Sequence, residues 1–452
     1  MAGTKGDSVH PVRARCAPER LCGLLTLALL VLFAAPTTAS PDADGVAVLR
    51  VGTSGDYAPF STARPDGSFE GFDIALVREY AEARGLQIEW VRFRWPDLAS
   101  DLAASRFDLA ASGVTLRADR ALLGAFTVPV AETGAMVLVR PGVGLTEADL
   151  SRPGLPMAVN AGGHLERVAR LLFPAAALRA IPDNAAVIAA LMSSEVDAVV
   201  TDSAEAVHWQ TQSLAPPPFG PFTRDRKAWL IGPGRDDLAS DINGWLIDLE
   251  ADGELARMRV AAGLGGDGRP ALAINALVTA IAERLALMPA VAEAKRLTNS
   301  PVHVPERERV VIASAVDAAR TSAARAGLPV AGDDALAAFF AELIAAARSV
   351  QEAVLAGPAA DPDAPATGVP DLDRSLRPAL LRIGARIGTL LPRLPAAIAR
   401  DAVAAEFARS LDLPGIDPER RQRLADAVAS VAAAPRDVPV LTATEAPPET
   451  SN

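Results

Sequence analysis

Cysteine is nearly absent from this chain, and aromatic residues are few. The 452 residues include two cysteines, Cys16 and Cys22, and 4% of the residues are aromatic. Because both cysteines lie near the start, the rest of the chain can form neither a disulfide nor a thiolate metal site. Basic residues are not in excess either, since the formal net charge is -11. Nucleic acid is therefore not expected as a partner, because phosphate binding requires a basic surface.

Lysine is the second residue that the chain almost lacks. Of 44 basic residues only three are lysines, namely Lys5, Lys227 and Lys295. Arginine serves almost wherever a cation is needed, so a remaining lysine marks a place that needs a compact charge or a titratable proton donor. Chance is the alternative explanation for each of them. We therefore single out Lys227 and Lys295 as candidate catalytic residues.

The first 39 residues have the pattern of an export signal. Arg13, Arg15 and Arg20 precede an apolar run, Leu21–Ala35, and small residues follow it. A membrane anchor is the alternative, but this run is shorter than the ~20 residues that span a bilayer. We find no later run that is long and apolar enough to span one. The sequence thus predicts a signal peptide over 1–39 and a periplasmic or secreted protein with no membrane association after cleavage.

Composition and periodicity divide the remaining chain into two domains. Half of the residues are hydrophobic, which excludes a disordered or collagen-like chain, and the length allows two or three domains. Residues 45–264 alternate β-rich runs with helical patterns, which predicts a two-lobed α/β domain with open parallel sheets. Residues 271–434 are rich in Ala, Leu, Arg and Glu at helical spacing, which predicts an all-α domain. We expect 435–452 to be a disordered tail.

Individual elements of the α/β domain follow from the same patterns. The strands expected are Val48–Gly52, Ile88–Phe93, Leu109–Ser112, Ala135–Val139, Met157–Val159, Ala198–Thr201 and Trp229–Ile231. The helices expected are Asp73–Arg84, Leu165–Leu172, Asn184–Ser193 and Ser203–Gln212. Ligands of such folds bind beyond the carboxyl ends of the strands.

Several segments of the first domain resemble a known family. They are GDYAPF (55–60), GFDIALVREYAEARG (71–85), WPDLASDLAASRFDLAASGVT (95–115), VNAGGHLERVAR (159–170) and RKAWLIGP (226–233). They are similar to the periplasmic solute-binding fold and, within it, to the exported cyclohexadienyl dehydratases. The resemblance implies removal of a hydroxyl group and carbon dioxide from prephenate, with arogenate as a further substrate to consider.

The dehydratase resemblance implies a set of site residues. Glu166 would be the general acid, with a pKa raised by burial, and Lys227 a second catalytic residue. The implied substrate-binding residues are Tyr57, Trp95, Thr115, Arg120, Asn160 and Asp202. Five of them have a plain alternative: Arg120 a surface cation, Glu166 a capping residue, Asp202 a helix N-cap, and the aromatic pair part of the core. His164 and Leu165 stand where the family leads us to expect Thr and Asn, so contacts at this turn are open.

The second domain resembles the secreted, all-helical chorismate mutases. The segments are LVTAIAERLALMPAVAEAKRLTNSPVHVPERERVV (277–311), FFAELIAAARSVQ (339–351) and PDLDRSLRPAL (370–380). The resemblance implies carboxylate clamps and a pair of donors at the ether oxygen. The clamps are Arg284, Arg307 and Arg377, and the donors are Lys295 and Gln351. The alternative is a helical bundle with solvated arginines.

Together these patterns predict an exported bifunctional enzyme of phenylalanine biosynthesis. Chorismate would become prephenate in the helical domain, and prephenate would become phenylpyruvate in the two-lobed domain. Neither reaction needs a metal or an organic cofactor, so none is expected, and a homo-oligomer is compatible with the sequence. Two alternatives stay open. One is a periplasmic amino-acid or small-acid binding protein with a helical accessory module, and the other is an active mutase joined to a degenerate first domain.

Overall fold

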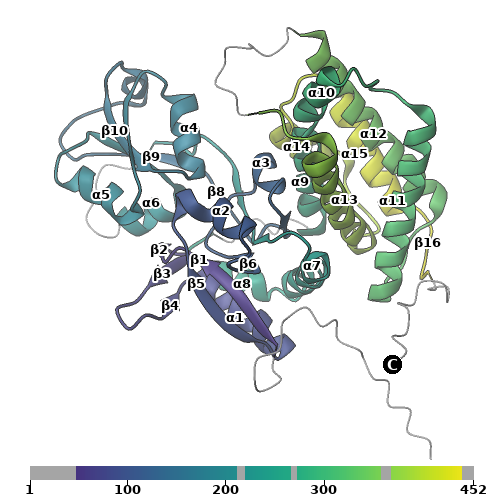
Figure 1. Ribbon diagram of the computed structural model, residues 1–452, viewed down its shortest axis with the longest axis horizontal. Coiled ribbons are helices and arrows are strands. Elements are labelled where there is room, and N and C mark those ends of the chain that lie inside the picture. The colour runs from purple at the N-terminus through teal and green to yellow at the C-terminus, as the bar shows by residue number, and fades with distance from the viewer. Residues whose placement is uncertain (1–46, 211–218, 266–271, 358–367, 440–452) are drawn as a thin grey trace, which may run out of the picture. The chain divides into compact units, whose positions relative to one another are not determined.

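A computed structural model describes residues 47–210, 219–265, 272–357 and 368–439 (Figure 1). The predicted signal peptide over 1–39 and residues 440–452 of the predicted tail lie outside the described residues. Of the seven strands and four helices expected for the first domain, each is present with its ends shifted by at most a few residues.

The first lobe is built on a five-stranded sheet with the order β5-β1-β6-β14-β7. Strands β1, β5 and β6 run parallel, whereas β14 is antiparallel to both of its neighbours. These strands are β1 (Val48–Thr53), β5 (Gln87–Arg92), β6 (Leu109–Ala110), β7 (Ala125–Phe126) and β14 (Leu230–Ile231). The lobe also contains β2 (Asp56–Tyr57), β3 (Ser61–Ala63), β4 (Phe69–Glu70), α1 (Phe72–Arg84), η1 (Trp95–Asp97), α2 (Leu98–Ala103), α3 (Ala118–Ala121), α7 (Asp236–Ala251) and α8 (Glu254–Ala261).

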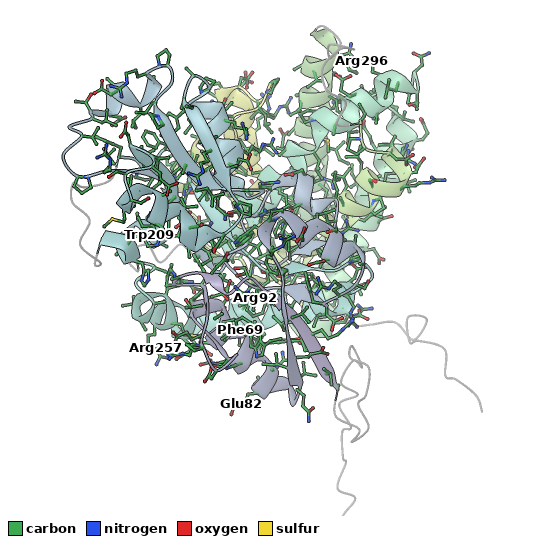
Figure 2. All side chains as sticks on the ribbon, turned by 60° about the vertical axis from the view of Figure 1, so that its left-hand side comes forward. Phe69, Glu82, Arg92, Trp209, Arg257 and Arg296 are labelled. Atoms are coloured by element: carbon green, nitrogen blue, oxygen red, sulfur yellow. The ribbon has the colours of Figure 1, made fainter. Side chains whose placement is uncertain are left out.

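The second lobe is a four-stranded sheet with helices on both faces. Its order is β11-β10-β12-β9, and β9 is antiparallel to β12. Alternate residues of the strands point to opposite faces, so Val137 packs with α4 whereas Leu138 packs with the cluster that contains the buried ring of Trp209 (Figure 2). The elements are β9 (Ala135–Val139), η2 (Glu147–Ser151), β10 (Pro156–Asn160), α4 (His164–Leu172), β11 (Ala177–Ile181), α5 (Asn184–Met192), β12 (Ala198–Asp202) and α6 (Ser203–Gln210).

Two features of the first domain differ from the sequence prediction. Both sheets are mixed, because β14 and β9 each add an antiparallel strand to a parallel sheet. A separate two-stranded pair, β8 (Ala131–Thr133) with β13 (Asp225–Lys227), is also present. Hydrophobic periodicity reports whether a strand is buried and not its direction, so the prediction of wholly parallel sheets was wrong.

The second domain is a bundle of long helices. Its elements are α9 (Leu272–Ala286), α10 (Met288–Leu297), α11 (Pro305–Ala326), α12 (Asp333–Ala356), η3 (Leu372–Leu376), α13 (Arg377–Leu390), η4 (Leu391–Arg393), α14 (Arg400–Ser410) and α15 (Pro418–Ala433). A short antiparallel pair, β15 (Val330–Ala331) with β16 (Arg436–Asp437), interrupts the all-helical pattern. The predicted tail therefore begins too early, because 436–437 pair with residues of the bundle.

One helical stretch of the bundle corrects the expectation about membrane spans. Within the described residues, Ala273–Leu297 is long and apolar enough to cross a bilayer, with a mean hydropathy of 1.4 over its best window. However, 61% of that window is buried inside the protein. The burial fits a core helix of a bundle, in which an apolar face is covered by neighbouring helices.

Candidate functional site

The first candidate pocket lies in the two-lobed domain and takes residues from both sheets. Residues at or just after the ends of strands β6, β10 and β12 line it, as expected for the carboxyl ends of parallel strands. The lining residues are Tyr57, Trp95, Gly113, Thr115, Arg120, Asn160, Gly163, His164, Leu165, Asn184, Glu205 and Lys227. Six of the eight residues predicted for the dehydratase site are among them.

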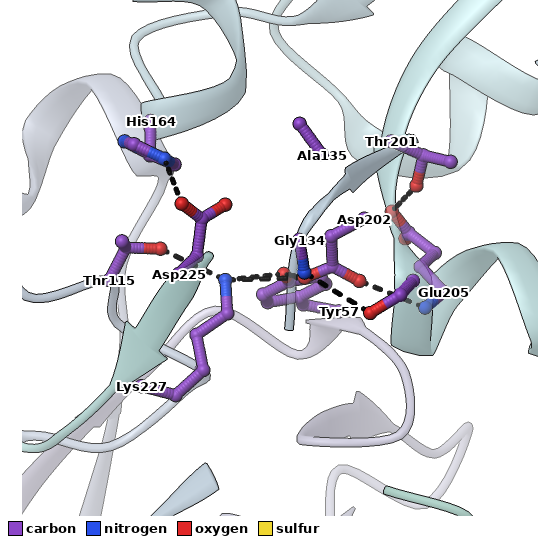
Figure 3. Close-up of polar contacts among 12 residues, drawn as sticks. Tyr57, Thr115, Gly134, Ala135, His164, Thr201, Asp202, Glu205, Asp225 and Lys227 are labelled. Carbon is purple, nitrogen blue, oxygen red and sulfur yellow. Dashed lines mark hydrogen bonds and ion pairs between the residues drawn. The ribbon is translucent and has the colours of Figure 1, made fainter. Parts of the chain in front are cut away.

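Lys227 is held at the centre of a polar cluster in this pocket. Its side chain is 2% exposed, and Nζ donates to the hydroxyls of Tyr57 and Thr115, each at 2.9 Å (Figure 3). The same nitrogen lies 3.2 Å from a carboxylate oxygen of Asp202. Strand β13 fixes the backbone of Lys227 by pairing with β8. The structure thus places the scarce lysine in a buried position with a defined geometry.

Asp202 lies behind the pocket wall instead of lining it. It is fully buried, accepts a hydrogen bond from the Tyr57 hydroxyl, and accepts the backbone N–H of Glu205 at 3.0 Å. Burial, followed by the charge of Asp202, raises the pKa of Tyr57 well above its ordinary value. Asp202 therefore caps α6, which was the alternative to a substrate-binding role, and it also pairs with Lys227. Its carboxylate has no free side toward a substrate ammonium group.

Arg120 is a second buried cation that lines this pocket. It lies in α3 at 5% exposure, and Nη1 donates to the Thr115 carbonyl at 3.2 Å. Burial, together with the charge of Arg117, lowers the pKa of Arg120 to about 9. Burial of this cation removes its favourable interactions with water. A carboxylate of a ligand would replace them, so the site favours an anionic ligand. Arg120 therefore has the surroundings of a carboxylate clamp and not those of a solvated surface residue.

Glu166 does not have the surroundings that the sequence predicts for it. It is absent from the pocket lining, and its carboxylate accepts the Gly162 amide at 2.7 Å and the Arg170 guanidinium at 2.6 Å. Partial burial raises the pKa of Glu166, but these two partners outweigh it and hold the pKa below its ordinary value. The expectation of a raised pKa is wrong here, because the helix end and an (i, i+4) arginine both stabilise the carboxylate.

The second candidate pocket lies in the helical domain and contains all five residues predicted for it. The lining residues are Arg284, Met288, Val291, Lys295, Pro301, Val302, Val304, Arg307, Glu308, Val311, Ile344, Ala347, Arg348, Gln351, Leu372, Arg377 and Leu380. They come from α9, α10, α11, α12, the η3–α13 segment and the connection between α10 and α11. Five cations stand against one carboxylate, so the lining favours an anion with more than one negative charge.

Lys295 and Arg284 are held in this pocket by backbone carbonyls. Arg284 donates to the Leu380 carbonyl at 2.9 Å, and Lys295 donates to the Val302 carbonyl at 3.3 Å. Burial lowers the pKa of Arg284 to about 10. Burial, followed by the charges of Arg307 and Arg377, lowers the pKa of Lys295. These cations repel one another while the pocket holds no anion, so a dianionic ligand relieves that repulsion.

Gln351 differs from its expected role in the direction of its amide. Its nitrogen donates to the Ala347 carbonyl at 3.1 Å, whereas its carbonyl oxygen is buried without a partner among the described residues. An ether oxygen accepts hydrogen bonds and does not donate them, so the amide has to rotate before its nitrogen can meet one. Gln351 therefore lines the predicted pocket, but its amide nitrogen is bonded to the Ala347 carbonyl and is not available to a ligand.

Comparison with known proteins agrees with the division of the chain into two domains. Residues 49–260 match the family of bacterial extracellular solute-binding proteins, family 3, and residues 275–352 match chorismate mutase type II. The cyclohexadienyl dehydratase of Pseudomonas aeruginosa is 32% identical over 222 residues, which cover 47% of this chain and 81% of that protein. The chain belongs to the cyclohexadienyl dehydratase family.

Binding proteins are also similar to this member of the dehydratase family. The L-cystine-binding protein TcyJ of Escherichia coli is 24% identical over 210 residues, covering 46% of this chain and 79% of that protein. The crystal structure of the ancestral amino acid-binding protein AncCDT-1, described as a precursor of cyclohexadienyl dehydratase, has 29% identity and a TM-score of 0.45. It covers 48% of this chain and 95% of its own.

Sequence reasoning missed two polar residues of the dehydratase-like pocket as site residues. Glu205 is 2% exposed and accepts hydrogen bonds from Thr201 at 2.6 Å and from Asn184 at 2.5 Å. Burial, followed by the charge of Asp202, raises the pKa of Glu205 well above its ordinary value. The second missed residue is Asn184. Glu205 lies one helical turn after Asp202, and this spacing was the signal that could have found it.

Asp73 lies beneath the same pocket and gives the dehydratase-like domain a pH dependence. It accepts the Gly113 amide at 2.6 Å and the Trp229 indole N–H at 3.1 Å. Burial raises the pKa of Asp73 from 3.8 to about 6, against the opposing effect of these donors and of Lys227. Between these two values the folded protein holds a proton that the unfolded chain has lost. The free energy of unfolding should therefore fall as the pH rises from about 4 to about 6, by up to about 3 kcal/mol from this group.

Urea unfolding at several pH values, followed by tryptophan fluorescence, measures this effect. All five tryptophans lie between positions 90 and 245, so the signal reports the dehydratase-like domain. Asp73→Asn should remove this part of the pH dependence. The variant should also have a lower free energy of unfolding at every pH, because its amide nitrogen would face a hydrogen-bond donor. Parallel pH curves for the wild type and the variant would contradict the assignment.

Proposed function

We propose that this chain is an exported bifunctional enzyme that converts chorismate to prephenate and prephenate to phenylpyruvate. The observation that carries the proposal is the presence of two cation-lined pockets in one chain that is similar to a cyclohexadienyl dehydratase and to chorismate mutase type II. The product of one reaction is the substrate of the other. Each pocket also contains one of the only two lysines outside the predicted signal peptide.

In the first pocket the cations suit a doubly charged ring. Prephenate carries two carboxylates, and Arg120 and Lys227 are buried cations that can pair with them. Dehydration breaks the bond between the ring and its hydroxyl, and the hydroxyl leaves as water with the electrons of that bond. The carbon–carbon bond to the ring carboxylate breaks as well, carbon dioxide leaves, and the electron pair of this second bond completes the aromatic ring. Burial of the pocket excludes water and strengthens each ionic contact. The protein's task is to hold the carboxylates and to protonate the departing oxygen.

In the second pocket the chemistry needs no proton transfer. The rearrangement of chorismate breaks a carbon–oxygen bond and forms a carbon–carbon bond within one molecule, so positioning and charge stabilisation supply the catalysis. Arg284, Arg307 and Arg377 line this pocket and would clamp the carboxylates in a compact conformation. Lys295 can stabilise the negative charge that develops on the ether oxygen. Gln351 joins it after rotation of its amide.

An amino-acid-binding function for the first domain is the competing proposal, and its support is the similarity to TcyJ. The arrangement around Asp202 argues against it. An α-ammonium group needs an available carboxylate, whereas Asp202 is already paired with Lys227 and the Tyr57 hydroxyl. Receiving an amino acid would require the buried lysine to move away from its counter-ion, which is costly.

The test is to supply purified full-length protein with chorismate and to follow phenylpyruvate by its absorbance in alkali. We expect prephenate to form first and phenylpyruvate to follow without any added metal or cofactor. Accumulation of prephenate with no phenylpyruvate would limit the proposal to the mutase. Absence of both products, together with tight binding of an amino acid, would favour the binding protein.

Export is proposed from residues 1–39 and has its own test. The basic segment and the apolar run predict cleavage near position 39. Expression of the full chain in a bacterial host should give periplasmic protein whose first residue, determined by mass spectrometry, lies close to Ser40. Recovery of uncleaved chain from the cytoplasm would contradict the proposal.

A further inference from the structure

The strand that carries Lys227 also contacts the helical domain, through its opposite face. Alternate residues of β13 point to opposite sides, so Lys227 points into the first pocket and Arg226 points away from it. Arg226 donates hydrogen bonds to the carboxylate of Glu406 and, at 3.0 Å, to the hydroxyl of Ser410, both on α14. The two domains belong to one compact unit. A single step along the backbone therefore separates a pocket cation from a contact with the other domain.

Glu406 is a buried carboxylate whose cationic partners come from both domains. The residue is 2% exposed. Besides Arg226, it accepts hydrogen bonds from Arg224 at 2.6 Å and from Arg409 at 2.7 Å. Burial raises the pKa of Glu406, but its arginine partners outweigh it and hold the pKa below its ordinary value. Because a buried carboxylate is costly unless it is paired, these contacts fix residues 224–226 against α14.

Arg226 in turn depends on the carboxylate of Glu406. The Arg226 side chain is 13% exposed, and burial, followed by the charge of Arg224, lowers its pKa. Its guanidinium forms an ion pair with Glu406, which compensates for both effects. If the charge of Glu406 were removed, the two arginines would repel each other beside β13. The strand would then be free to shift, and Lys227 would move with it.

The helical domain also contacts the residue next to the other cation of the first pocket. Arg382 on α13 donates a hydrogen bond to the carbonyl of Ala121 at 2.9 Å. Ala121 ends α3 and directly follows Arg120. Helix α13 also packs against β7 and α7 of the first lobe, and buried residues of both domains form one hydrophobic cluster. Both cations of the first pocket thus have a sequence neighbour that the helical domain holds.

We propose that the helical domain positions the two cations of the dehydratase site; this rests on the function proposed above. The positioning residues are Glu406 for Lys227 and Arg382 for Arg120. Neither of them lines the second pocket, so they do not hold chorismate. A group that binds a substrate carboxylate has to keep its productive geometry, because a displacement of about 1 Å can cost about 100-fold in rate. The helical domain is therefore part of the dehydratase site and not only a source of prephenate.

The decisive variant is Glu406→Gln, made in the full-length chain and assayed with prephenate and with chorismate. Glutamine keeps the size of the side chain and removes the charge that pairs with Arg226. We expect kcat/KM for prephenate to fall at least about tenfold, because Lys227 loses its placement. The kcat for chorismate should stay within twofold, although the substitution lies in the helical domain. Tryptophan fluorescence shows whether the first domain is folded under the assay conditions.

Glu342→Gln is the matched control. Glu342 on α12 pairs with Arg420 at 2.8 Å and with Arg423 at 3.6 Å, and all three residues belong to the helical domain. The control variant therefore also loses a carboxylate with arginine partners, but none of them lies near the first pocket. Its kcat/KM for prephenate should stay within twofold of the wild type.

A double-mutant cycle tests the contact from the side of the strand. Arg226→Gln should reduce kcat/KM for prephenate about as much as Glu406→Gln does, and the double variant should lose little more than either single variant. Two residues that acted only on stability would give no such coupling in the kinetics of folded protein. Arg382→Gln should raise KM for prephenate more than it lowers kcat, because Arg120 is the carboxylate clamp.

Three results would overturn the assignment. In the first, folded Glu406→Gln or Arg226→Gln keeps kcat/KM for prephenate within twofold of the wild type. In the second, the losses of the two variants are additive, which would show that their contact does not position Lys227. In the third, Glu342→Gln causes the same loss as Glu406→Gln. Failure of the wild-type protein to convert prephenate would instead refute the proposed function, so the two failures are distinguishable.

Discussion

Replacing Lys227 with methionine should reduce kcat/KM for prephenate by about 1000-fold or more and leave chorismate turnover within threefold of the wild type. The ammonium group is one of two buried cations in the first pocket and has no nearby substitute among the lining residues. Charge-stabilising donors inside a dry site are worth about 10²- to 10³-fold each, and substrate binding is lost in addition. Steady-state kinetics with each substrate on the same preparation measure both effects.

Stability has to be separated from catalysis in this experiment. Without Lys227, the carboxylate of Asp202 is left buried and unpaired as a charge, at a cost of about 3–5 kcal/mol. Adding Asp202→Asn to Lys227→Met removes that charge and should recover most of the lost stability, measured by thermal unfolding. Activity should stay lost. Recovery of prephenate turnover in the double variant would contradict a role for Lys227 in catalysis.

Replacing Lys295 with alanine should lower kcat for chorismate by about 100- to 1000-fold and spare prephenate turnover. Lys295 is the cation assigned to the ether oxygen, where charge develops during the rearrangement. Its own bond to the Val302 carbonyl is long, at 3.3 Å, so little structure depends on it. Chorismate disappearance, followed by ultraviolet absorbance, gives kcat and KM for the variant.

Arg309 provides the matched control for the second pocket. Replacing Arg309 also removes a cation from α11, but the Arg309 side chain is 74% exposed and pairs with Glu306 at 3.1 Å. Arg309→Ala should change chorismate kcat by less than twofold, because surface ion pairs contribute little. Equal losses for Lys295→Ala and Arg309→Ala would show that net charge, and not the placed lysine, supports the reaction.

The sequence predicts the elements of the two domains well because their hydrophobic periodicity is strong. Three strands of the second lobe, β9, β10 and β12, are largely buried on both faces, so they appear as apolar runs bounded by turns. The edge strand β11 is mostly exposed or half-buried and was not among the strands expected. Strand direction has no such signal, which is why β9 and β14 were expected to be parallel. The pair β15–β16 is only two residues on each side, too short for any periodic pattern.

Some site residues could be predicted from the sequence, and others depend on contacts that only the folded chain makes. Scarcity of lysine, read with the family resemblances, points to Lys227 and Lys295, and the structure places both in pockets. The environment of Glu166 could not be predicted, because it depends on an arginine one turn later and on a backbone amide. His164 and Asp225 come together from positions 61 residues apart. Only folding brings these two side chains within hydrogen-bond distance, at 2.9 Å.

The central claim is that two separate pockets catalyse consecutive reactions. Mixing two variants, each of which lacks one of the two activities, tests this claim directly. The first variant carries Lys227→Met with Asp202→Asn and keeps only the mutase activity, and the second carries Lys295→Ala and keeps only the dehydratase activity. Neither chain alone should convert chorismate to phenylpyruvate at more than about 1% of the wild-type rate. The equimolar mixture should restore phenylpyruvate formation, because prephenate made by the first chain diffuses to the second. A mixture that forms no phenylpyruvate would contradict the account.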